Sequence, residues 1–423
     1  MKWRKSLALL AVGAMVAVAA CSESDSDGDS SSTDDSQEEP TTRTTRGVTD
    51  DTIKVGAIAT EAIYGPIGVG FQARLDRANR EGELPGGRQF DYVGLVDDMQ
   101  TDAGNLAAAQ SLVEEDEVFA IAMNSALPSS VDYLGEQTVP LVGWAIGPQW
   151  CGAENAFGFS GGCLTPPDPQ VASNAIGLLT QDLVGGDAEG QTVAIIADDN
   201  DLGQSGITTQ TAAFEAVGFD VAYGEARIPA PPAPAPSDYS PFVNELLTSA
   251  DGDAPDVIYL LTSPNNTLAM IQALKDQSYE GEILNAVAYD SRLTSAAAGV
   301  SSYIQYAGFE TAPENEYMEQ MIGDLERTDP ELAGQIPIQT LAAGYFSGEF
   351  LVRVLQEVGE DVTAERFLQI ANDDFEFGIP DTLGTITYPD SHNQGSPCGS
   401  LMTYTGTEFE VAVPFMCGEL IEL

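Results

Sequence analysis

Short apolar segments alternate with amphipathic ones along the body of this chain. Four segments rich in β-branched and aromatic residues, at 52–58, 90–96, 118–122 and 139–144, are separated by helical patterns at 66–79, 105–115 and 129–136. Apolar strands separated by helices of this length are typical of a parallel sheet that carries helices on both faces. The first third of the chain therefore predicts an α/β fold.

The same alternation restarts after the proline-rich segment 166–169. A helix is expected over 171–183, and strands are expected at 192–197, 219–223 and 256–261, with further helices between them. The roughly 375 residues from Gly47 onward are enough for two packed bodies rather than one core. We expect two doubly wound parallel-sheet lobes.

The N-terminus has the pattern of a secretory signal. Lys2, Arg4 and Lys5 precede an uncharged run that ends in small residues directly before Cys21. The run is too short for a comfortable membrane span. A cysteine at this point is typical of bacterial lipoprotein signals, so we expect removal of residues 1–20 and lipidation of Cys21. An ordinary signal peptide followed by an unrelated cysteine is the alternative.

Residues 21–46 are almost entirely Ser, Asp, Glu, Thr and Gly. Such a segment cannot bury enough apolar surface to offset its ordering entropy, so we expect a disordered acidic tether. No later apolar run is long enough to span a membrane, which leaves the lipid on Cys21 as the expected membrane attachment. The folded part would then work outside the cytoplasmic membrane.

The charge of the chain excludes some partners. It has 66 acidic against 16 basic residues, a formal net charge of −50. A surface of this sign repels phosphates, so we expect neither nucleic-acid binding nor docking on anionic lipid. We interpret the excess of acids as a solubility feature rather than as a functional face.

Four cysteines remain once Cys21 is set aside: Cys151, Cys163, Cys398 and Cys417. An even set in an oxidising compartment indicates disulfides. Three pairings are possible, and proximity alone favours Cys151 with Cys163 and Cys398 with Cys417. The chain has no Cys-x-x-Cys pair and a single histidine, so we expect no metal site.

One segment matches a nucleophile pattern. Residues 158–162 read G-x-S-x-G around Ser160, but that motif needs a strand before it and a helix after it. Here Pro166 and Pro167 follow, and the only histidine, His392, lies in a polar loop. We therefore do not expect an enzyme.

Residues 198–203 superficially resemble a calcium loop. Leu202 stands where a ligand belongs, and Thr209 stands where the bidentate Glu belongs. The segment is predicted to be a polar turn between a strand and a helix, and we expect no cofactor.

Doubly wound sheets bind ligands beyond the carboxyl ends of their strands. The loops expected there contain polar, aromatic and small residues rather than nucleophiles, which favours binding over catalysis. These loops are 61–65, 123–125, 144–147, 200–202, 263–265 and 289–290.

Several segments together resemble a known family. Residues 47–56, followed by Tyr64-Gly65-Pro66-Ile67-Gly68, are similar to the opening of type I periplasmic binding proteins, closest to the leucine/isoleucine/valine-binding branch that feeds ABC importers. The resemblance extends from about Gly47 to the C-terminus. It continues through residues 95–98, 107–113, 195–198, 203–206 and 343–345.

The resemblance implies two lobes joined by three hinge strands, which close on a small ligand and deliver it to a membrane permease. We expect the chain to cross between lobes near Pro167, Tyr289 and Asp373. The first lobe would contain residues 47–167 and 290–372, and the second would contain 168–289 and 373–423.

Amino-acid binders of this family hold the ligand carboxylate with a Ser and an Ala-x-Thr turn of the first lobe. The matching positions are Asn124 or Ser125, then Ala145 and Gly147, so the threonine hydroxyl is missing. Trp144 lies beside this turn and would provide an apolar wall, packing being the alternative reading.

The second lobe of the family offers a Tyr and a Glu to the ligand ammonium. Leu202 and Asn265 match these positions, and losing the Glu removes a charge partner. Asp290 would replace it if it faces the ligand, a hinge-side hydrogen bond being the alternative. Tyr64 and Tyr289 are further candidate walls or packing residues. The ligand is therefore not restricted to branched-chain amino acids.

These patterns predict an extracytoplasmic, lipid-anchored solute-binding protein. It would act as a monomer, capture a small polar ligand such as an amino acid or a related compound, and deliver it to the permease subunits of an ABC importer. A ligand-sensing lipoprotein of the same fold, reporting to a membrane receptor, is the alternative, and a surface enzyme is a remote third.

Overall fold

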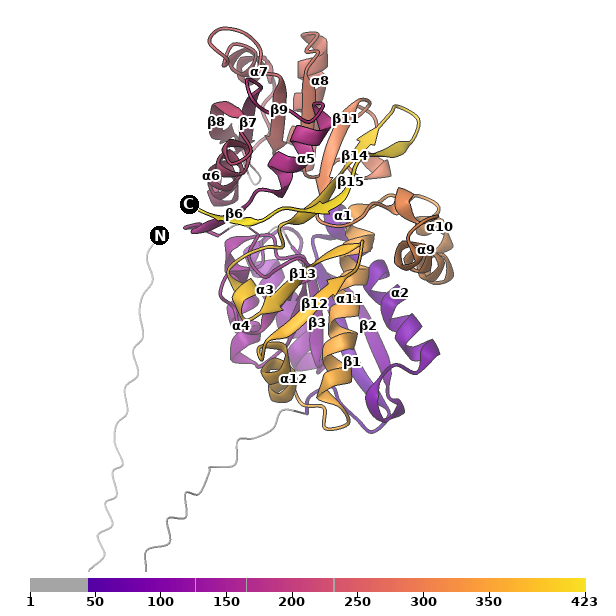
Figure 1. Cartoon of the computed structure of the whole chain (residues 1–423). Coiled ribbons are helices and arrows are strands. Elements are labelled where there is room, and N and C mark those ends of the chain that lie inside the picture. The colour runs from indigo at the N-terminus through magenta and orange to yellow at the C-terminus, as the bar shows by residue number, and fades with distance from the viewer. Residues whose placement is uncertain (1–44, 126, 165, 231–232) are drawn as a thin grey trace, which may run out of the picture. The chain divides into compact units, whose positions relative to one another are not determined.

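The computed structural model describes residues 45–423 except 126, 165 and 231–232. The predicted signal peptide, Cys21 and nearly all of the predicted tether lie outside these residues. Two separate sheets organise the described chain (Figure 1). Within the same residues, no helix combines the length and the apolar character that a membrane span requires.

We define the first lobe as the five-stranded sheet together with the helices packed on it. The strand order is β2-β1-β3-β4-β5, and every neighbouring pair is parallel. Parallel strands with both faces covered are apolar throughout, which is why β3 is buried at every residue. The strands are β1 (Thr52–Ala59), β2 (Gln89–Asp97), β3 (Ala120–Asn124), β4 (Leu141–Gly143) and β5 (Ala156–Gly158).

Helix α11 (Gln339–Val358) is the central helix of this lobe and is almost wholly buried. It packs against α2 (Pro66–Glu81) through glycines, since a Cβ on Gly70 would lie 2.0 Å from the Leu341 carbonyl oxygen. A Cβ on Gly344 would lie 2.1 Å from the Ile67 carbonyl oxygen. The other helices are α1 (Glu61–Tyr64), α3 (Asp102–Gln110), α4 (Val131–Glu136), α9 (Glu316–Thr328), α10 (Pro330–Ala333) and α12 (Ala364–Ala371).

We expect the substitution Gly344→Ala to lower the free energy of unfolding by about 1–3 kcal/mol, because the added methyl group must push two backbones apart. Gly323→Ala in α9 is the control. The nearest atom to its added Cβ is the end of the flexible Arg327 side chain at 3.5 Å. Urea denaturation measures the stability of both variants. An unchanged midpoint for Gly344→Ala would contradict the prediction, because it would show that α2 and α11 can move apart without loss of stability.

The second lobe is a seven-stranded sheet in the order β15-β14-β11-β10-β9-β7-β8. Its strands are parallel except at the edge, where β14 runs antiparallel to β11 and to β15. The strands are β7 (Thr192–Asp198), β8 (Asp220–Ile228), β9 (Val257–Leu261), β10 (Glu282–Asn285), β11 (Val300–Ile304), β14 (Cys398–Tyr404) and β15 (Phe409–Cys417). The helices are α5 (Ala175–Leu183), α6 (Asp201–Glu215), α7 (Ser240–Leu246) and α8 (Pro264–Asp276).

The helix expected from residue 171 begins later than predicted. Residues Val171–Ser173 form strand β6, which pairs antiparallel with the C-terminal strand β16 (Leu420–Glu422). The partner lies more than 240 residues away in the sequence, so a local pattern gives no sign of it. Helix α5 starts only after Asn174.

Two of the three passages between lobes come later in the chain than expected. Strand β11 still belongs to the second sheet, so the chain returns to the first lobe after Ile304 rather than near Tyr289. The hairpin of β12 (Phe375–Ile379) and β13 (Leu383–Tyr388) packs its rings on Phe350 of α11. The last passage therefore precedes Cys398 instead of lying near Asp373. The first passage runs from β5 to β6, a stretch that includes Pro167.

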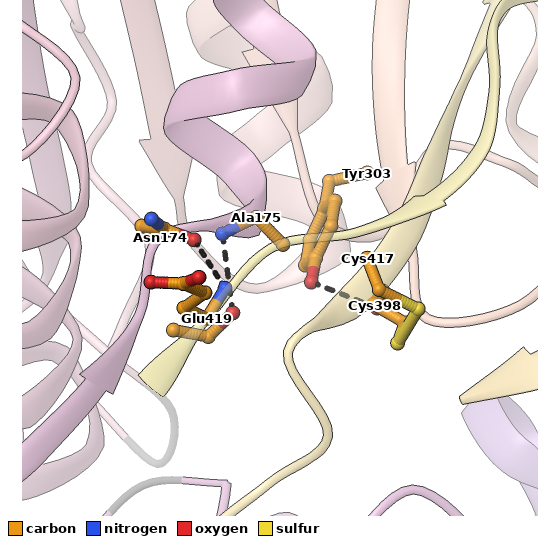
Figure 2. Close-up of a disulfide and its surroundings, with 7 residues drawn as sticks. Asn174, Ala175, Tyr303, Cys398, Cys417 and Glu419 are labelled. Carbon is orange, nitrogen blue, oxygen red and sulfur yellow. Dashed lines mark hydrogen bonds between the residues drawn. A yellow bond between two sulfur atoms is a disulfide. The ribbon is translucent and has the colours of Figure 1, made fainter. Parts of the chain in front are cut away.

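Both disulfides predicted from proximity are present, Cys151–Cys163 and Cys398–Cys417. The second joins directly opposed residues of β14 and β15. Beyond it, the Glu419 amide donates to Asn174 Oδ1 at 2.7 Å, and the Asn174 amide donates to the Glu419 carbonyl at 3.1 Å (Figure 2). The disulfide and these bonds hold the C-terminal strand against the start of the second lobe.

Candidate functional site

The loops after β1, β2 and β3 meet at Asp98, which is fully buried. Its carboxylate accepts hydrogen bonds from Thr60 Oγ1 at 2.8 Å, the Gln100 amide at 2.9 Å, Asn105 Nδ2 at 3.3 Å and the Ser125 hydroxyl. A carboxylate that accepts this many hydrogen bonds fixes the loops around it. The sequence did not single out Asp98 as a site residue, although it lies in one of the segments that carry the resemblance.

Asn124 is the last residue of β3, and its side chain is 0 % exposed. Neither Oδ1 nor Nδ2 has a hydrogen-bond partner among the described residues. A buried amide without partners costs roughly 1–3 kcal/mol, and such groups in native proteins call for an explanation. The amide lies at the carboxyl edge of the sheet, the edge at which doubly wound sheets bind ligands.

Ser125 follows directly and, unlike Asn124, its side chain has hydrogen-bond partners. Its hydroxyl donates to Asp98, and its oxygen accepts the Leu127 amide at 3.0 Å. Ser125 therefore has a positioning role in the loop, and its proton is already used.

Tyr64 connects the two lobes electrostatically. Burial, together with smaller contributions from the carboxylates of Asp98 and Asp198, raises the pKa of its phenol to about 12. Asp98 follows β2 in the first lobe, whereas Asp198 ends β7 in the second. The charges of two buried acids, one at the carboxyl edge of each sheet, thus act on the same phenol.

Asp198 organises the edge of the second lobe. It accepts the Ser263 amide at 2.9 Å and Asn266 Nδ2 at 2.8 Å, and it is 6 % exposed. Burial raises the pKa of this carboxyl against the opposing effect of these bonds. Asn266 also accepts the Tyr239 hydroxyl at 2.6 Å.

The two second-lobe positions predicted from the resemblance lie on the surface of their helices. Asn265 is exposed, and its neighbour Asn266 makes the contacts in this cluster. Leu202 is 40 % exposed in the first turn of α6, beside the cap formed when Asn200 Oδ1 accepts the Gly203 amide at 2.8 Å. The sequence alone does not show which of two adjacent asparagines makes these contacts. The packing of α8 decides it.

Trp144, Ala145 and Gly147 follow β4 and lie near the hinge. The Trp144 indole N–H donates to Gln305 Oε1 at 3.1 Å, and the same oxygen accepts the Ser160 hydroxyl at 3.0 Å. Gln305 follows β11 in the passage between lobes. Ala145 is fully buried, and Gly147 has a φ of 108°, which a side chain would strain. Ser160 therefore serves as a hinge hydrogen-bond donor.

Tyr289 and Asp290 already have protein partners. The Tyr289 hydroxyl donates to Glu310 Oε2 at 2.5 Å and accepts the Phe309 amide at 2.7 Å within the core. Asp290 accepts Arg292 Nε at 2.9 Å on one oxygen and Arg292 Nη2 at 2.6 Å on the other. Arg292 Nη2 also reaches the Ile63 carbonyl in α1 at 3.3 Å. The structure thus places Tyr289 in packing and Asp290 in an ion pair.

One cavity of the described chain lies away from these residues. It has a volume of about 540 Å³ and lies between the β12–β13 hairpin and β15, with Glu376, Asp381, Thr385 and Phe415 in its lining. None of the candidate residues borders it. Among the described residues, no group of His, Cys, Asp and Glu is arranged to hold a metal ion.

A family model described as "Periplasmic binding protein" matches residues 52–408. The comparison with curated protein sequences gives no match. Solved structures are similar at low identity, and all those compared below share the fold over most of both chains.

A possible leucine/isoleucine/valine-binding protein from Rhodopirellula baltica SH 1 is 16% identical, with a TM-score of 0.66 over 86% of this chain and 96% of its own. A solute-binding protein of an ABC transporter from Rhodopseudomonas palustris HaA2, in complex with p-hydroxybenzoic acid, is 17% identical. Its TM-score is 0.68 over 87% of this chain and 98% of its own. A fatty acid ABC transporter substrate-binding protein from Thermomonospora curvata is 17% identical, with a TM-score of 0.65 over 88% of this chain and 94% of its own.

The chain therefore belongs to the periplasmic binding protein family, a family of extracytoplasmic solute-binding proteins and not of enzymes. Its fold is that of type I periplasmic binding proteins, as the sequence predicted.

Proposed function

We propose that this protein captures a small polar solute between the carboxyl edges of its two sheets and delivers it to the permease of an ABC importer, anchored to the membrane through a lipid on Cys21. The observation that carries the proposal is the Asn124 amide, which is buried at the sheet edge and has no partner among the described residues. A ligand that satisfies this amide would recover the cost of burying it.

The proposal requires that the two lobes close on the ligand. A ligand that contacts both lobes stabilises the closed form over the open one, and its differential affinity sets the size of the shift. Tyr64, near Asp98 of one lobe and Asp198 of the other, supports the view that one small molecule can reach both edges. One similar structure is in complex with p-hydroxybenzoic acid and another is described as the substrate-binding protein of a fatty acid ABC transporter, so the fold alone does not determine the solute.

A thermal-shift screen against amino acids, amides, carboxylates, aromatics and sugars tests the proposal. A ligand at a hundred times its Kd stabilises by about 2.7 kcal/mol. We expect Asn124→Leu to abolish the shift given by such a ligand. The same substitution should leave the unliganded protein as stable or about 1–3 kcal/mol more stable, because it removes an unpartnered buried amide.

Asn155→Leu is the matched control. Asn155 is also a buried asparagine, but its Nδ2 donates to the Val139 carbonyl at 3.2 Å, and it lies in the turn before β5, at the amino end of that strand. This variant should lose stability and keep the ligand shift. An undiminished ligand shift in Asn124→Leu would remove Asn124 from the site and leave the proposal without its main support.

A further inference from the structure

We propose that the solute carries no net negative charge where it meets the sheet edges, and that a neutral amide-like or hydroxyl group, or a cation, occupies the place at Asn124. This inference rests on the proposed function and names the chemical class of its ligand. Four features of the described edges lead to it.

The first feature is the Asn124 amide itself. Its side chain offers a donor and an acceptor in one plane, and both are unpartnered. A carboxylate is an acceptor only, so it would satisfy Nδ2 and leave Oδ1 facing another acceptor. An amide, a urea-like group or a hydroxyl supplies both a donor and an acceptor.

The second feature is that several donors suited to an anion are already used. The Ser125 proton goes to Asp98. At the helices that begin on these edges, the Gly104 amide of α3 is taken by Thr101 Oγ1 at 3.0 Å and the Gly203 amide of α6 by Asn200 Oδ1. The Ser263 amide before α8 is taken by Asp198. Free N–H groups at helix starts are the usual neutral binders of anions, and these are occupied.

The third feature is the placement of the cations. Arg292 is the basic residue at these edges in the described chain, and its Nε and Nη2 are bound to the buried Asp290. A carboxylate ligand would have to compete with that carboxylate for the guanidinium. The other described basic residues that form side-chain hydrogen bonds or ion pairs do so elsewhere: Arg46, Arg74, Arg77, Arg80, Arg88, Arg227, Lys275, Arg327, Arg353 and Arg366.

The fourth feature is the sign of the local field. Asp98 and Asp198 are both buried at the carboxyl edges of their sheets, and the charge of each raises the pKa of the Tyr64 phenol. In surroundings of low dielectric constant, a ligand carboxylate near Tyr64 would be repelled by both. A neutral group avoids this repulsion, and an ammonium group gains attraction.

Matched ligand series on the whole protein test the inference by isothermal titration. The series are benzoate and benzamide, 4-hydroxybenzoate and 4-hydroxybenzamide, and leucine and leucinamide. Where a scaffold binds, we expect the amide to bind at least about tenfold more tightly than the acid. Tighter binding of the acids overturns the inference and leaves the proposed function intact. Absence of binding in all three series and in the wider solute screen counts against the proposed function itself.

Two charge variants give a readout that does not depend on the scaffold. Asn124→Asp turns the donor into a second acceptor and adds a negative charge, so it should weaken binding of the amide by more than about tenfold. Asn244→Asp makes the same change of net charge at an exposed position in α7 and should change the affinity by less than about twofold. Equal effects of the two variants would overturn the inference, and their melting temperatures show whether both remain folded.

Discussion

Replacing Glu349 by alanine should lower the free energy of unfolding by about 3–5 kcal/mol, the largest effect expected of a single substitution considered for this protein. Glu349 lies in α11 and accepts Arg74 Nε from α2 and Arg353 Nε at 2.7 Å. Arg74 also donates Nη1 and Nη2 to Glu83 at 3.1 and 2.6 Å. The network thus crosses the closest helix contact of the first lobe.

The size of the effect follows from burial. Arg74 is 2 % exposed, so removal of Glu349 leaves a guanidinium in the core with one acid where it had two. Burial by itself raises the pKa of the Glu349 carboxyl, but Arg74 and Arg353 outweigh it and hold the pKa below its ordinary value. The native state therefore keeps Glu349 ionised, and leaving the buried Arg74 guanidinium without this carboxylate is costly.

Glu81→Ala provides the comparison for Glu349→Ala. Its carboxylate pairs with Arg77 Nε at 3.3 Å on the surface of α2 and is 43% exposed. Exposed pairs of this kind contribute about 0–1 kcal/mol. Urea denaturation at fixed pH measures both variants. Similar losses in the two proteins would contradict the assignment of the Arg74 network as a buried ionic contact.

Acidification should destabilise the protein through its single histidine. His392 is 3 % exposed, with ring centroids of Phe157 and Tyr388 at 5.3 and 4.6 Å and with Asn372 Oδ1 at 2.5 Å from Nε2. Burial lowers the pKa of the imidazole from 6.5 to about 4, against a smaller opposing effect of the Ala156 backbone.

The direction of this pH dependence follows from proton binding in the folded and unfolded states. Between pH 6.5 and 4 the unfolded chain binds a proton at His392 that the folded protein does not, so the free energy of unfolding falls as the pH drops through this window. The full contribution is present above pH 6.5. A shift of this size corresponds to about 3 kcal/mol of stability lost by pH 4.

The comparison with His392→Gln isolates the effect, because the carboxylates titrate in both proteins and cancel in the difference. The wild-type free energy of unfolding should fall by about 3 kcal/mol more than that of the variant between pH 7 and 4. The chain has one histidine, so a single imidazole resonance reports the pKa by NMR. A resonance that titrates near pH 6.5 would contradict the burial of this side chain.

Local patterns predicted the parts of the fold that are decided locally. The expected strands at 52–58 and 256–261 correspond to β1 (Thr52–Ala59) and β9 (Val257–Leu261), since buried parallel strands are apolar along their whole length. Both disulfides connect cysteines that are close in the sequence, so proximity was sufficient.

What the sequence missed depends on contacts between distant segments. Strand β6 exists because β16 pairs with it, and the β12–β13 hairpin stays in the first lobe because its aromatic rings meet Phe350. Periodicity within a window carries no information on such partners.

The candidate site shows the same division. Asn124 was predicted from its position after an apolar strand, and the structure places it at the sheet edge. The role of Asp98 depends on donors from three loops and from helix α3, and the choice between Asn265 and Asn266 depends on how α8 packs against Asp198. Neither follows from the residue types alone.

A crystal structure with a solute from the thermal-shift screen would test the central claim most directly. The account predicts that polar atoms of the solute lie within hydrogen-bond distance, roughly 2.7–3.2 Å, of both Asn124 Nδ2 and Asn124 Oδ1, with Tyr64 beside the solute. A solute bound instead in the cavity between the β12–β13 hairpin and β15, with the Asn124 amide still unpartnered, would contradict it.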